Sequence, residues 1–469
     1  MPRRARIAGI EVAPSRAEEV TSGTRDAWGE RLPRKLGLPS AIAFLLTSII
    51  GAGIFRVPAT VAAQLGQPGP ILLTWALGGV ITLCGALSMA ELAAAFPRSG
   101  GLFTFMLEAY GPVPAFVYGW AELTIIAPAS MAAVATIFAE YLGYFVPLGT
   151  GAVRWVSALA LLSVGLMNYL GVRLSAAVNN LTTVAKCGGL AALGILAFVA
   201  GSGDVQHFSP AWSGGLRPSL MATALVSVMF TYDGWVDLLR VAGEIRQPDR
   251  NLPRALIAGS VFIAIIYLAV NAAYIYLVPV DQMAGAKLIA ASAAERIPLL
   301  GNRGAALIAA LVMISCFGNI AAAAMSMPRT QFAMADRGYF FGALARISPR
   351  FQTPSTAIAV ITALAMLYAL IGTFQQLAER FILGLWPFYA LDVAAVLVLR
   401  RTRPDLARPY RVWGYPAVPV LFLLGSAALI LNALWTEPLD TGITFAIIFA
   451  GLPAYLLWRK LFHRPAAAA

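Results

Sequence analysis

The chain has 469 residues, 59% of which are hydrophobic while only 12% are charged, and its mean hydropathy is +0.76. A soluble domain carries about 25% charged residues, so the composition excludes an ordinary soluble protein and indicates an integral membrane protein. The net charge of +12 does not indicate a nucleic-acid-binding protein, because the basic residues gather in every second loop between apolar segments.

Few residues are available for enzymatic or metal chemistry. The two histidines, His207 and His463, have no partner at metal-ligand spacing, and neither a zinc-protease motif nor a phosphate-binding loop occurs. The three cysteines, Cys84, Cys187 and Cys316, fall inside apolar segments and are interpreted as packing residues. We therefore expect no enzyme activity, no cofactor and no bound metal.

Residues 1–37 are polar and of mixed charge, which predicts a largely disordered cytoplasmic segment. No apolar stretch within it precedes a cleavage site, so a removed secretion signal is not expected. Twelve apolar segments long enough to span a bilayer follow. They occupy residues 38–65, 70–96, 113–146, 153–171, 174–200, 218–242, 254–279, 304–333, 354–376, 381–400, 415–435 and 441–461.

The basic residues predict how these segments are oriented. With the N-terminus inside the cell, 26 of the 34 Lys and Arg residues fall on the cytoplasmic side and 6 in external loops. This bias places both termini, including the tail 462–469, in the cytoplasm.

The predicted fold is an all-α polytopic membrane protein with 12 transmembrane helices in one domain, residues 38–461. Segments 1–5 and 6–10 have opposite topology, because five is an odd number of crossings. They are expected to form a LeuT-type 5+5 inverted repeat at about 38–200 and 218–400, followed by two additional helices at 415–461.

The first apolar segment is interrupted at Ile49, Ile50, Gly51, Ala52 and Gly53. Two glycines this close weaken a helix, and broken backbone inside a bilayer is tolerated only where protein or a water-filled cavity surrounds it. The break frees N–H groups of the following half-helix, which suit a carboxylate, and C=O groups of the preceding half, which suit an ammonium. The alternative is that these small residues only allow helices to pack closely.

A second interruption lies at Phe230, Thr231, Asp233 and Gly234, in the first segment of the second half. Two interrupted helices at corresponding places are the sequence pattern of a transporter's substrate site, and a zwitterion fits between their ends. Asp233 either caps the second half of this helix or faces the cavity and attracts a cationic or polar substrate side chain. Phe230 is interpreted as an aromatic residue that closes over substrate, or else as part of the core.

Ionisable residues deep in apolar segments are the remaining candidates for function. Lys186 lies about 18 Å from either membrane surface, given the rise of a helix, too deep for its side chain to reach water. It is expected to stand in for a sodium ion or to exchange protons, unless it only tethers neighbouring segments. Glu122 and Asp392 are possible proton sites, and pairing with an internal base is the alternative that we favour for both.

Two further acids and one loop complete the pattern. Glu91, near the cytoplasmic end of segment 2, is expected to cap a helix or to pair with a loop base, and Glu140 to lie at the outer interface. The loop at 97–105 has turn residues followed by an amphipathic run, which predicts a short helix on the cytoplasmic face.

Together these motifs resemble the amino acid–polyamine–organocation (APC) superfamily, most closely its L-type amino acid transporter branch. The motifs in the first half are 48–58 (SIIGAGIFRVP), 90–92 (AEL), 97–104 (PRSGGLFT), 118–120 (YGW) and 138–142 (FAEYL). Those in the second half are 230–235 (FTYDGW), 243–253 (GEIRQPDRNLP), 401–410 (RTRPDLARPY) and 415–416 (YP). They cover essentially residues 38–461 in the expected order, and their combination is highly specific.

The resemblance implies secondary transport of amino acids, usually sodium-independent and often by exchange. The substrate's α-carboxylate would lie on the N–H groups of residues 51–53, and its α-amino group at the carbonyls near Ile49 and Phe230. Lys186 resembles the family's lysine that replaces a sodium ion, and Phe230 resembles its aromatic gate.

The chain also departs from the family pattern. Ala52 replaces a frequent serine, and Glu122 and Asp392 are acids at positions where none is expected. The loop at 147–155 lacks the cysteine through which eukaryotic members attach a heavy chain. No disulfide-linked heavy chain is therefore expected, and a prokaryotic inner-membrane protein fits best.

We therefore predict a sodium-independent amino acid transporter of the inner membrane that works by alternating access, with exchange favoured. The alternatives are a proton-coupled symporter of amino acids or polyamines, and a membrane sensor that binds an amino acid without transporting it. The expected partners are the amino acid substrate and the lipid bilayer, without nucleic acid. The sequence leaves the amino acid, the coupling and the oligomeric state open.

Overall fold

The computed structural model describes residues 6–7, 10–11, 34, 36–97, 100–170, 188–215, 217–286, 288–351 and 353–462. Lys186 and most of the terminal segments 1–37 and 462–469 lie outside the described residues. The described part is mostly helical, apart from an antiparallel pair of two-residue strands, β1 (Arg6–Ile7) and β2 (Ile10–Glu11).

The helices of the first half begin with an interrupted one and continue with long apolar ones. They are α2 (Leu38–Ile49), η1 (Gly53–Phe55), α3 (Val57–Leu65), α4 (Pro68–Ala95), α5 (Leu102–Tyr110), α6 (Pro112–Ala121), the π-helical turn η2 (Glu122–Ile126), α7 (Ala127–Leu142), α8 (Thr150–Leu170) and a helix at Gly188–Ala200. Proline stands in the first turn of several of them, where its missing N–H costs no hydrogen bond.

The second half opens with a short helix and then another interrupted one. Its helices are η3 (Val205–Phe208), α10 (Pro218–Tyr232), α11 (Asp237–Arg240), η4 (Ala242–Glu244), α12 (Pro248–Leu277), α13 (Val280–Gly285), α14 (Ile289–Glu295), η5 (Pro298–Arg303), α15 (Gly304–Asp336), η6 (Gly342–Ala345), α16 (Ser355–Ile371) and α17 (Phe374–Thr402). The chain ends in α18 (Ala417–Thr436), α19 (Pro438–Phe449) and α20 (Gly451–Phe462).

Eight helices within the described ranges are long and apolar enough to cross a membrane, and four further apolar helices are shorter. Two of the shorter ones, Leu38–Ile49 and Pro218–Tyr232, are the first halves of the two segments that the sequence predicts to be interrupted. The short helix predicted in the loop at 97–105 is present as α5, which begins after Gly100 and Gly101. The chain is thus a helical, multi-pass membrane protein.

One predicted boundary is wrong. The sequence places a connection after residue 376, but α16 ends at Ile371 and α17 begins at Phe374. The side chains of Thr373 and Gln376 each accept a hydrogen bond from the other's backbone N–H. This capping box starts the helix earlier than hydropathy indicates, so that Arg380 lies inside α17 rather than in a loop.

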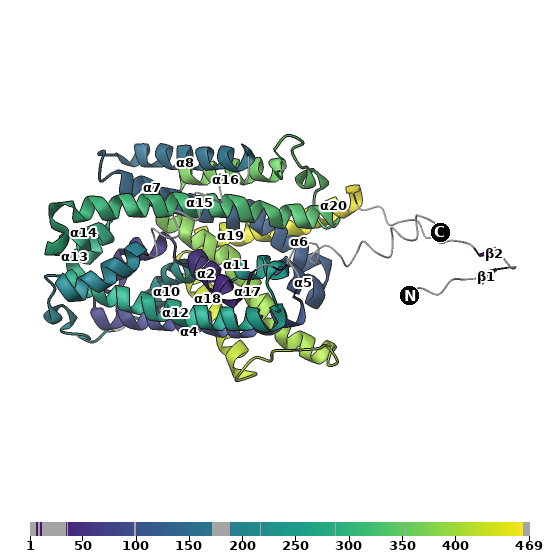
Figure 1. The fold of residues 1–469 in the computed structure, drawn as a ribbon, viewed down its shortest axis with the longest axis horizontal. Coiled ribbons are helices and arrows are strands. Elements are labelled where there is room, and N and C mark those ends of the chain that lie inside the picture. The colour runs from purple at the N-terminus through teal and green to yellow at the C-terminus, as the bar shows by residue number, and fades with distance from the viewer. Residues whose placement is uncertain are drawn as a thin grey trace.

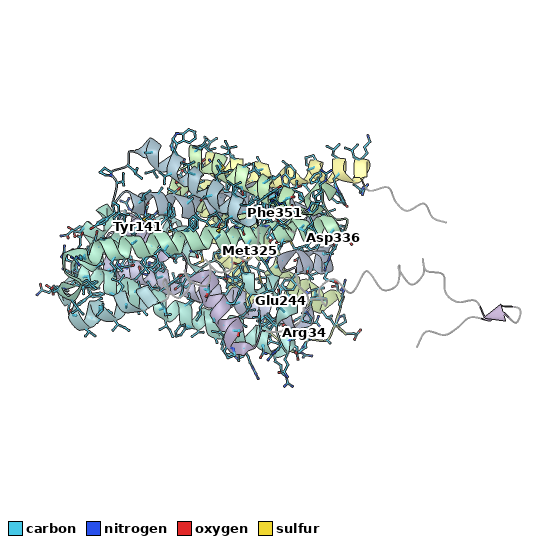
Figure 2. All side chains as sticks on the ribbon, turned by 45° about the horizontal axis from the view of Figure 1, so that its top comes forward. Arg34, Tyr141, Glu244, Met325, Asp336 and Phe351 are labelled. Atoms are coloured by element: carbon cyan, nitrogen blue, oxygen red, sulfur yellow. The ribbon has the colours of Figure 1, made fainter. Side chains whose placement is uncertain are left out.

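The helices form a bundle of long, roughly parallel rods (Figure 1). Helices α8 and α16 pack together along one edge, α15 packs on α7 beneath them, and α4 lies along α12 at the opposite edge. Figure 2 shows Tyr141 near one end of the bundle and Asp336 near the other, with Met325 between them. We call these the Glu140 end and the Asp336 end.

Main-chain and aromatic contacts fix the interrupted helices within the bundle. Next to α2, Leu36 donates an N–H to Glu244 O (3.0 Å) and accepts one from Arg246 (2.8 Å), forming a parallel bridge with Ile245. Near the end of α10, the ring of Tyr232 packs against Trp75 of α4 and Tyr267 of α12, with centroids 5.9 and 5.1 Å away. The segment that follows α11 is therefore tied to the start of α2.

Candidate functional site

The first break has the geometry that the sequence predicts. Helix α2 ends at Ile49, and Ile50 closes it by donating its N–H to Leu46 O at 2.8 Å. Regular structure resumes only in the short turn η1, where Phe55 N–H donates to Ala52 O. Within the described residues the N–H groups of Gly51, Ala52 and Gly53 make no backbone hydrogen bond, which leaves them available to an anion.

The second break follows α10. Asp233 has extended backbone angles, Gly234 has a φ of +109°, and the chain becomes helical again at Asp237. The positive φ is a conformation that glycine adopts freely and other residues rarely adopt. Both interruptions predicted from the sequence are thus present.

The two breaks touch each other. A Cβ on Gly234 would lie 2.5 Å from Ser48 O, and a Cβ on Gly53 would lie 2.7 Å from Thr231 Oγ1. Glycine is therefore required on each side for the two chains to approach this closely. The hydroxyl of Tyr267 lies between the breaks, 2.9 Å from Ile49 O and 3.2 Å from Thr231 O, so that its single proton is shared by the two carbonyl oxygens. Each carbonyl oxygen has a second lone pair that a substrate ammonium can use.

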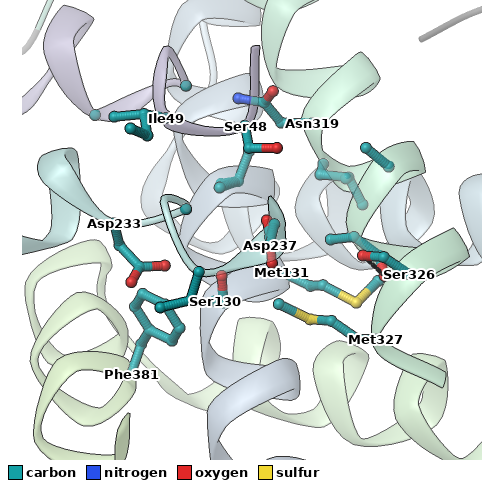
Figure 3. Close-up of a pocket in the computed structure, with 18 of the residues that line it drawn as sticks. Ser48, Ile49, Ser130, Met131, Asp233, Asp237, Asn319, Ser326, Met327 and Phe381 are labelled. Atoms are coloured by element: carbon teal, nitrogen blue, oxygen red, sulfur yellow. Dashed lines mark hydrogen bonds between the residues drawn. The ribbon is translucent and has the colours of Figure 1, made fainter. Parts of the chain in front are cut away.

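A cavity of about 180 Å³ lies beside the contact between the breaks (Figure 3). Its wall is largely apolar with a few convergent polar groups, as is typical of small-molecule sites. Of the predicted substrate-binding residues, it is lined by Ile49, Gly51, Ala52, Gly53, Phe230, Thr231, Asp233 and Gly234. Ile50 is the exception: it is buried in the helix packing and does not line the cavity.

A large part of the remaining cavity wall comes from three helices that lie around the breaks. It includes Ser130 and Met131 of α7, Asn319, Ser326 and Met327 of α15, and Phe381 and Tyr389 of α17. The Thr231 hydroxyl oxygen is buried and has no hydrogen-bond partner among the described residues. An unpaired buried hydroxyl is costly, so it marks a point where a ligand can bind.

Asp233 does not cap the second half of its helix. The residue at the start of α11 is Val236, and it makes no side-chain cap. The carboxylate of Asp233 instead accepts a hydrogen bond from the Tyr389 hydroxyl at 2.7 Å and lines the cavity. Of the two interpretations left open by the sequence, the structure therefore favours the one in which Asp233 faces the cavity.

Glu122 is paired with a base, which is the interpretation that we favoured. Arg240 places one guanidinium nitrogen 3.0 Å from Glu122 Oε1, a second 3.0 Å from Thr330 Oγ1 and a third 3.2 Å from Asp237 Oδ1. Glu122 is fully buried at the start of η2. Asp237 and Arg240 both line the cavity, and neither is among the candidates chosen from the sequence. Their i, i+3 spacing directly after the break is the signal that could have found them.

Asp392 differs from Glu122. It is fully buried on α17, and neither carboxylate oxygen has a hydrogen-bond partner within the described part of the chain. The pairing that we favoured for Asp392 is therefore not found there, and Asp392 does not line the cavity. Lys186 lies outside the described residues.

Glu91 pairs with two bases, which confirms the prediction that this acid pairs with a base. Its carboxylate lies 2.6 Å from Arg400 and 3.4 Å from Arg408, and it accepts the Val412 N–H at 2.7 Å. Because Arg400 lies in the last turn of α17 and Val412 precedes α18, this acid joins α4 to both helices.

Apolar membrane helices, two facing backbone breaks and a cavity between them define a membrane transporter of a small polar solute. Comparison with known proteins identifies the class more closely. The family model described as amino acid permease matches residues 36–455, and the chain belongs to that family.

Several curated relatives match over nearly their whole length. The serine/threonine exchanger SteT of Bacillus subtilis (strain 168) is 32% identical over 431 residues, which cover 92% of this chain and 98% of the relative. The human cystine/glutamate transporter is 31% identical, and the match covers 92% of this chain and 87% of the relative. The human b(0,+)-type amino acid transporter 1 is 30% identical, and the match covers 94% of this chain and 91% of the relative.

These matches confirm the resemblance to the amino acid–polyamine–organocation superfamily. The chain is a transporter of amino acids and not an enzyme. One of these relatives is named an exchanger, which supports the prediction of exchange.

Proposed function

We propose that this chain exchanges amino acids across the membrane by alternating access, with the backbone of the substrate held between the two breaks. The observation that carries this proposal is the unbonded N–H groups of Gly51, Ala52 and Gly53 beside the orphan hydroxyl of Thr231. The N–H groups take the α-carboxylate. The ammonium is attracted by the free lone pair of Ile49 O, which lines the cavity with them.

The charges of the cavity wall support neutral and cationic substrates over anionic ones. Asp233 and Asp237 line the cavity, and the base that lines it, Arg240, is already bound to Glu122 and Asp237. An acidic substrate side chain would therefore meet net negative charge. We propose serine and threonine as the first substrates, as the name of the Bacillus subtilis relative indicates, and lysine as a competitor.

The architecture predicted from the sequence is part of this proposal. The positions of the breaks, one in α2–α3 and one in α10–α11, support 12 transmembrane helices with a LeuT-type repeat at about 38–200 and 218–400. The bias of Lys and Arg supports cytoplasmic termini and an inner-membrane location. The absence of cysteine from 147–155 supports a protein without a disulfide-linked heavy chain.

Purified protein in liposomes tests the mechanism. We expect labelled serine to enter liposomes loaded with unlabelled serine and not empty ones, at the same rate in sodium and in choline buffer. Lysine should slow the uptake, and glutamate should not. Uptake into empty liposomes that requires a pH gradient would replace exchange by proton symport, which the unpaired Asp392 would serve. Binding of serine without any uptake would identify a sensor.

Lys186 is proposed to replace a sodium ion in the transport cycle, because an ammonium this deep in an apolar segment is costly without a function. Lys186→Ala should abolish exchange or make it leak while the protein still accumulates in the membrane. Lys460→Ala, at the end of α20, is the control for loss of a lysine charge. Exchange at the parent rate in Lys186→Ala would remove this role.

A further inference from the structure

A layer of side chains separates the cavity from the Glu140 end of the bundle. Arg56 Nε lies 2.8 Å from Glu140 Oε2, and the two side chains are only 14% and 15% exposed. The same guanidinium lies 5.2 Å from the ring centroid of Phe374. Phe374 meets Phe230 edge-on, with centroids 5.6 Å apart. Contacts therefore run without interruption from Phe230, which lines the cavity, to the ion pair.

The layer joins helices that are broken to helices that have no break at this level. Arg56 follows η1 in the first break, and Phe230 lies in the last turn of α10 before the second. Glu140 is near the end of α7, and Phe374 is the first residue of α17. The Tyr141 hydroxyl adds a second bond between α7 and the first break, to Phe55 O at 2.7 Å.

The burial of the ion pair suits a contact that opens and closes. Fully buried pairs leave an uncompensated charge when they separate, whereas exposed pairs contribute little. At about 15% exposure, each partner can be rehydrated once the layer parts, yet the closed pair is shielded enough to hold. The ring of Phe374 stabilises the guanidinium only in the closed arrangement.

We propose that Arg56, Glu140 and Phe374 form the gate that closes the cavity on the Glu140 side, and that Phe230 couples substrate occupancy to this gate. The direction of opening rests on the proposed function, because it assumes that the Glu140 end faces the outside. Substrate that enters from that end must separate Arg56 from Glu140 and displace it from Phe374.

Cysteine labelling in cells tests the gate without requiring transport. Cys84, Cys187 and Cys316 are replaced by alanine, Ser130 in the cavity wall by cysteine, and a membrane-impermeant maleimide is added outside. Made in this parent protein, Arg56→Gln and Glu140→Gln should each let the introduced cysteine react with the maleimide at least ~5-fold faster, a change of about 1 kcal/mol. The charge exchange Arg56→Glu with Glu140→Arg should slow labelling again.

Asp440→Asn is the matched control, because Arg380 and Asp440 form an ion pair of the same 2.8 Å length that does not line the cavity. It should label at the parent rate. Labelling of the introduced cysteine at the same rate in the parent, in Arg56→Gln and in Glu140→Gln would overturn the gate.

A second comparison tests the coupling through Phe374. Serine, threonine or lysine outside should change the labelling rate of the parent by about 3-fold, and Phe374→Leu should lose this response while Phe351→Leu keeps it. Phe351 is a fair control because Arg350 lies over its ring at the same 5.2 Å. A response retained in Phe374→Leu, or absent from the parent with all three amino acids, would overturn the coupling. Failure of exchange in liposomes would leave both comparisons interpretable.

Discussion

The hydroxyl of Thr231 occupies a position where substrate binding and protein stability make opposite demands. It is buried beside the first break and has no hydrogen-bond partner within the described ranges. An unpaired buried polar group destabilises a protein by roughly 1–3 kcal/mol. Under the proposed function, a bound amino acid that pairs with this hydroxyl would recover the loss.

Thr231→Val should separate these two effects. Valine has nearly the same shape without the hydroxyl, so the KM for serine should rise about 3- to 10-fold, since a hydrogen bond contributes about 0.5–1.5 kcal/mol. The Tm of the substrate-free protein should stay constant or rise. Thr441→Val is the opposite control, because its hydroxyl bonds Ala433 O at 3.0 Å, and it should lower Tm without changing KM. A lower Tm and unchanged KM in Thr231→Val would make its hydroxyl structural.

Gly53→Ala tests the close contact between the breaks. The added Cβ would lie 2.7 Å from Thr231 Oγ1 and 3.1 Å from its Cα, so the backbone of one break must move. We expect serine exchange to fall at least ~10-fold, the effect of about 1.4 kcal/mol, while the protein still accumulates. Gly442→Ala meets nothing within 4 Å and should exchange normally. Comparable activity in the two variants would contradict the required contact.

The predicted residues that line the cavity are those with a local signal in the sequence. Glycine pairs and an acid next to a break stand out in an apolar segment, and eight of the nine predicted substrate-binding residues line the cavity. Tyr267 and Tyr389 have no such signal, because an aromatic residue in a long apolar helix is interpreted as a packing residue of the hydrophobic core. Their roles come from partners far along the chain, 218 residues for Tyr267 and 156 for Tyr389.

At the scale of elements, buried acids connect the ends of helices that are distant in the sequence. Glu91 near the end of α4 holds Arg400 of α17, Arg408 and the N–H of Val412 together. The sequence indicated a paired acid here, but not its partners. Hydropathy locates a helix, whereas its neighbours are set by side-chain contacts such as these.

Glu91→Gln should destabilise the bundle without altering the cavity. Removing the charge leaves Arg400 and the largely buried Arg408 without their carboxylate, and breaking a buried pair can cost about 3–5 kcal/mol. We expect Tm in detergent to fall by several degrees and KM to stay constant. Glu108→Gln, whose partner Arg403 is 48% exposed, should change Tm little. Equal effects of the two substitutions would remove the special role of Glu91.

For the molecule as a whole, alternating access requires that parts of the two broken helices move together. The bridge of Leu36 with Ile245 ties the start of α2 to the segment that follows α11 through main-chain bonds of 3.0 and 2.8 Å. A transporter with this bridge can move both pieces as one unit. The bridge could not be predicted from the sequence, because main-chain pairing places no demand on side-chain type.

Leu36→Pro should therefore slow exchange several-fold, because proline has no N–H to donate to Glu244 O. Leu36→Ala keeps the main-chain bonds and should be close to the parent. Initial rates of serine exchange in liposomes, normalised to the amount of protein, give the comparison. Equal rates in both variants would mean that the bridge plays no part in the motion.

The π-helical turn η2 has a consequence for how this transporter can change. Glu122 and Ser130 are eight positions apart, which in a regular helix would point them about 80° away from each other. One extra residue in the turn reduces this to about 20°, so that Glu122 meets Arg240 while Ser130 lines the cavity. By the same geometry, loss of a single codon from this turn would leave the two positions seven residues apart in a regular helix, again about 20°, so this wall can lose the turn and keep its orientation.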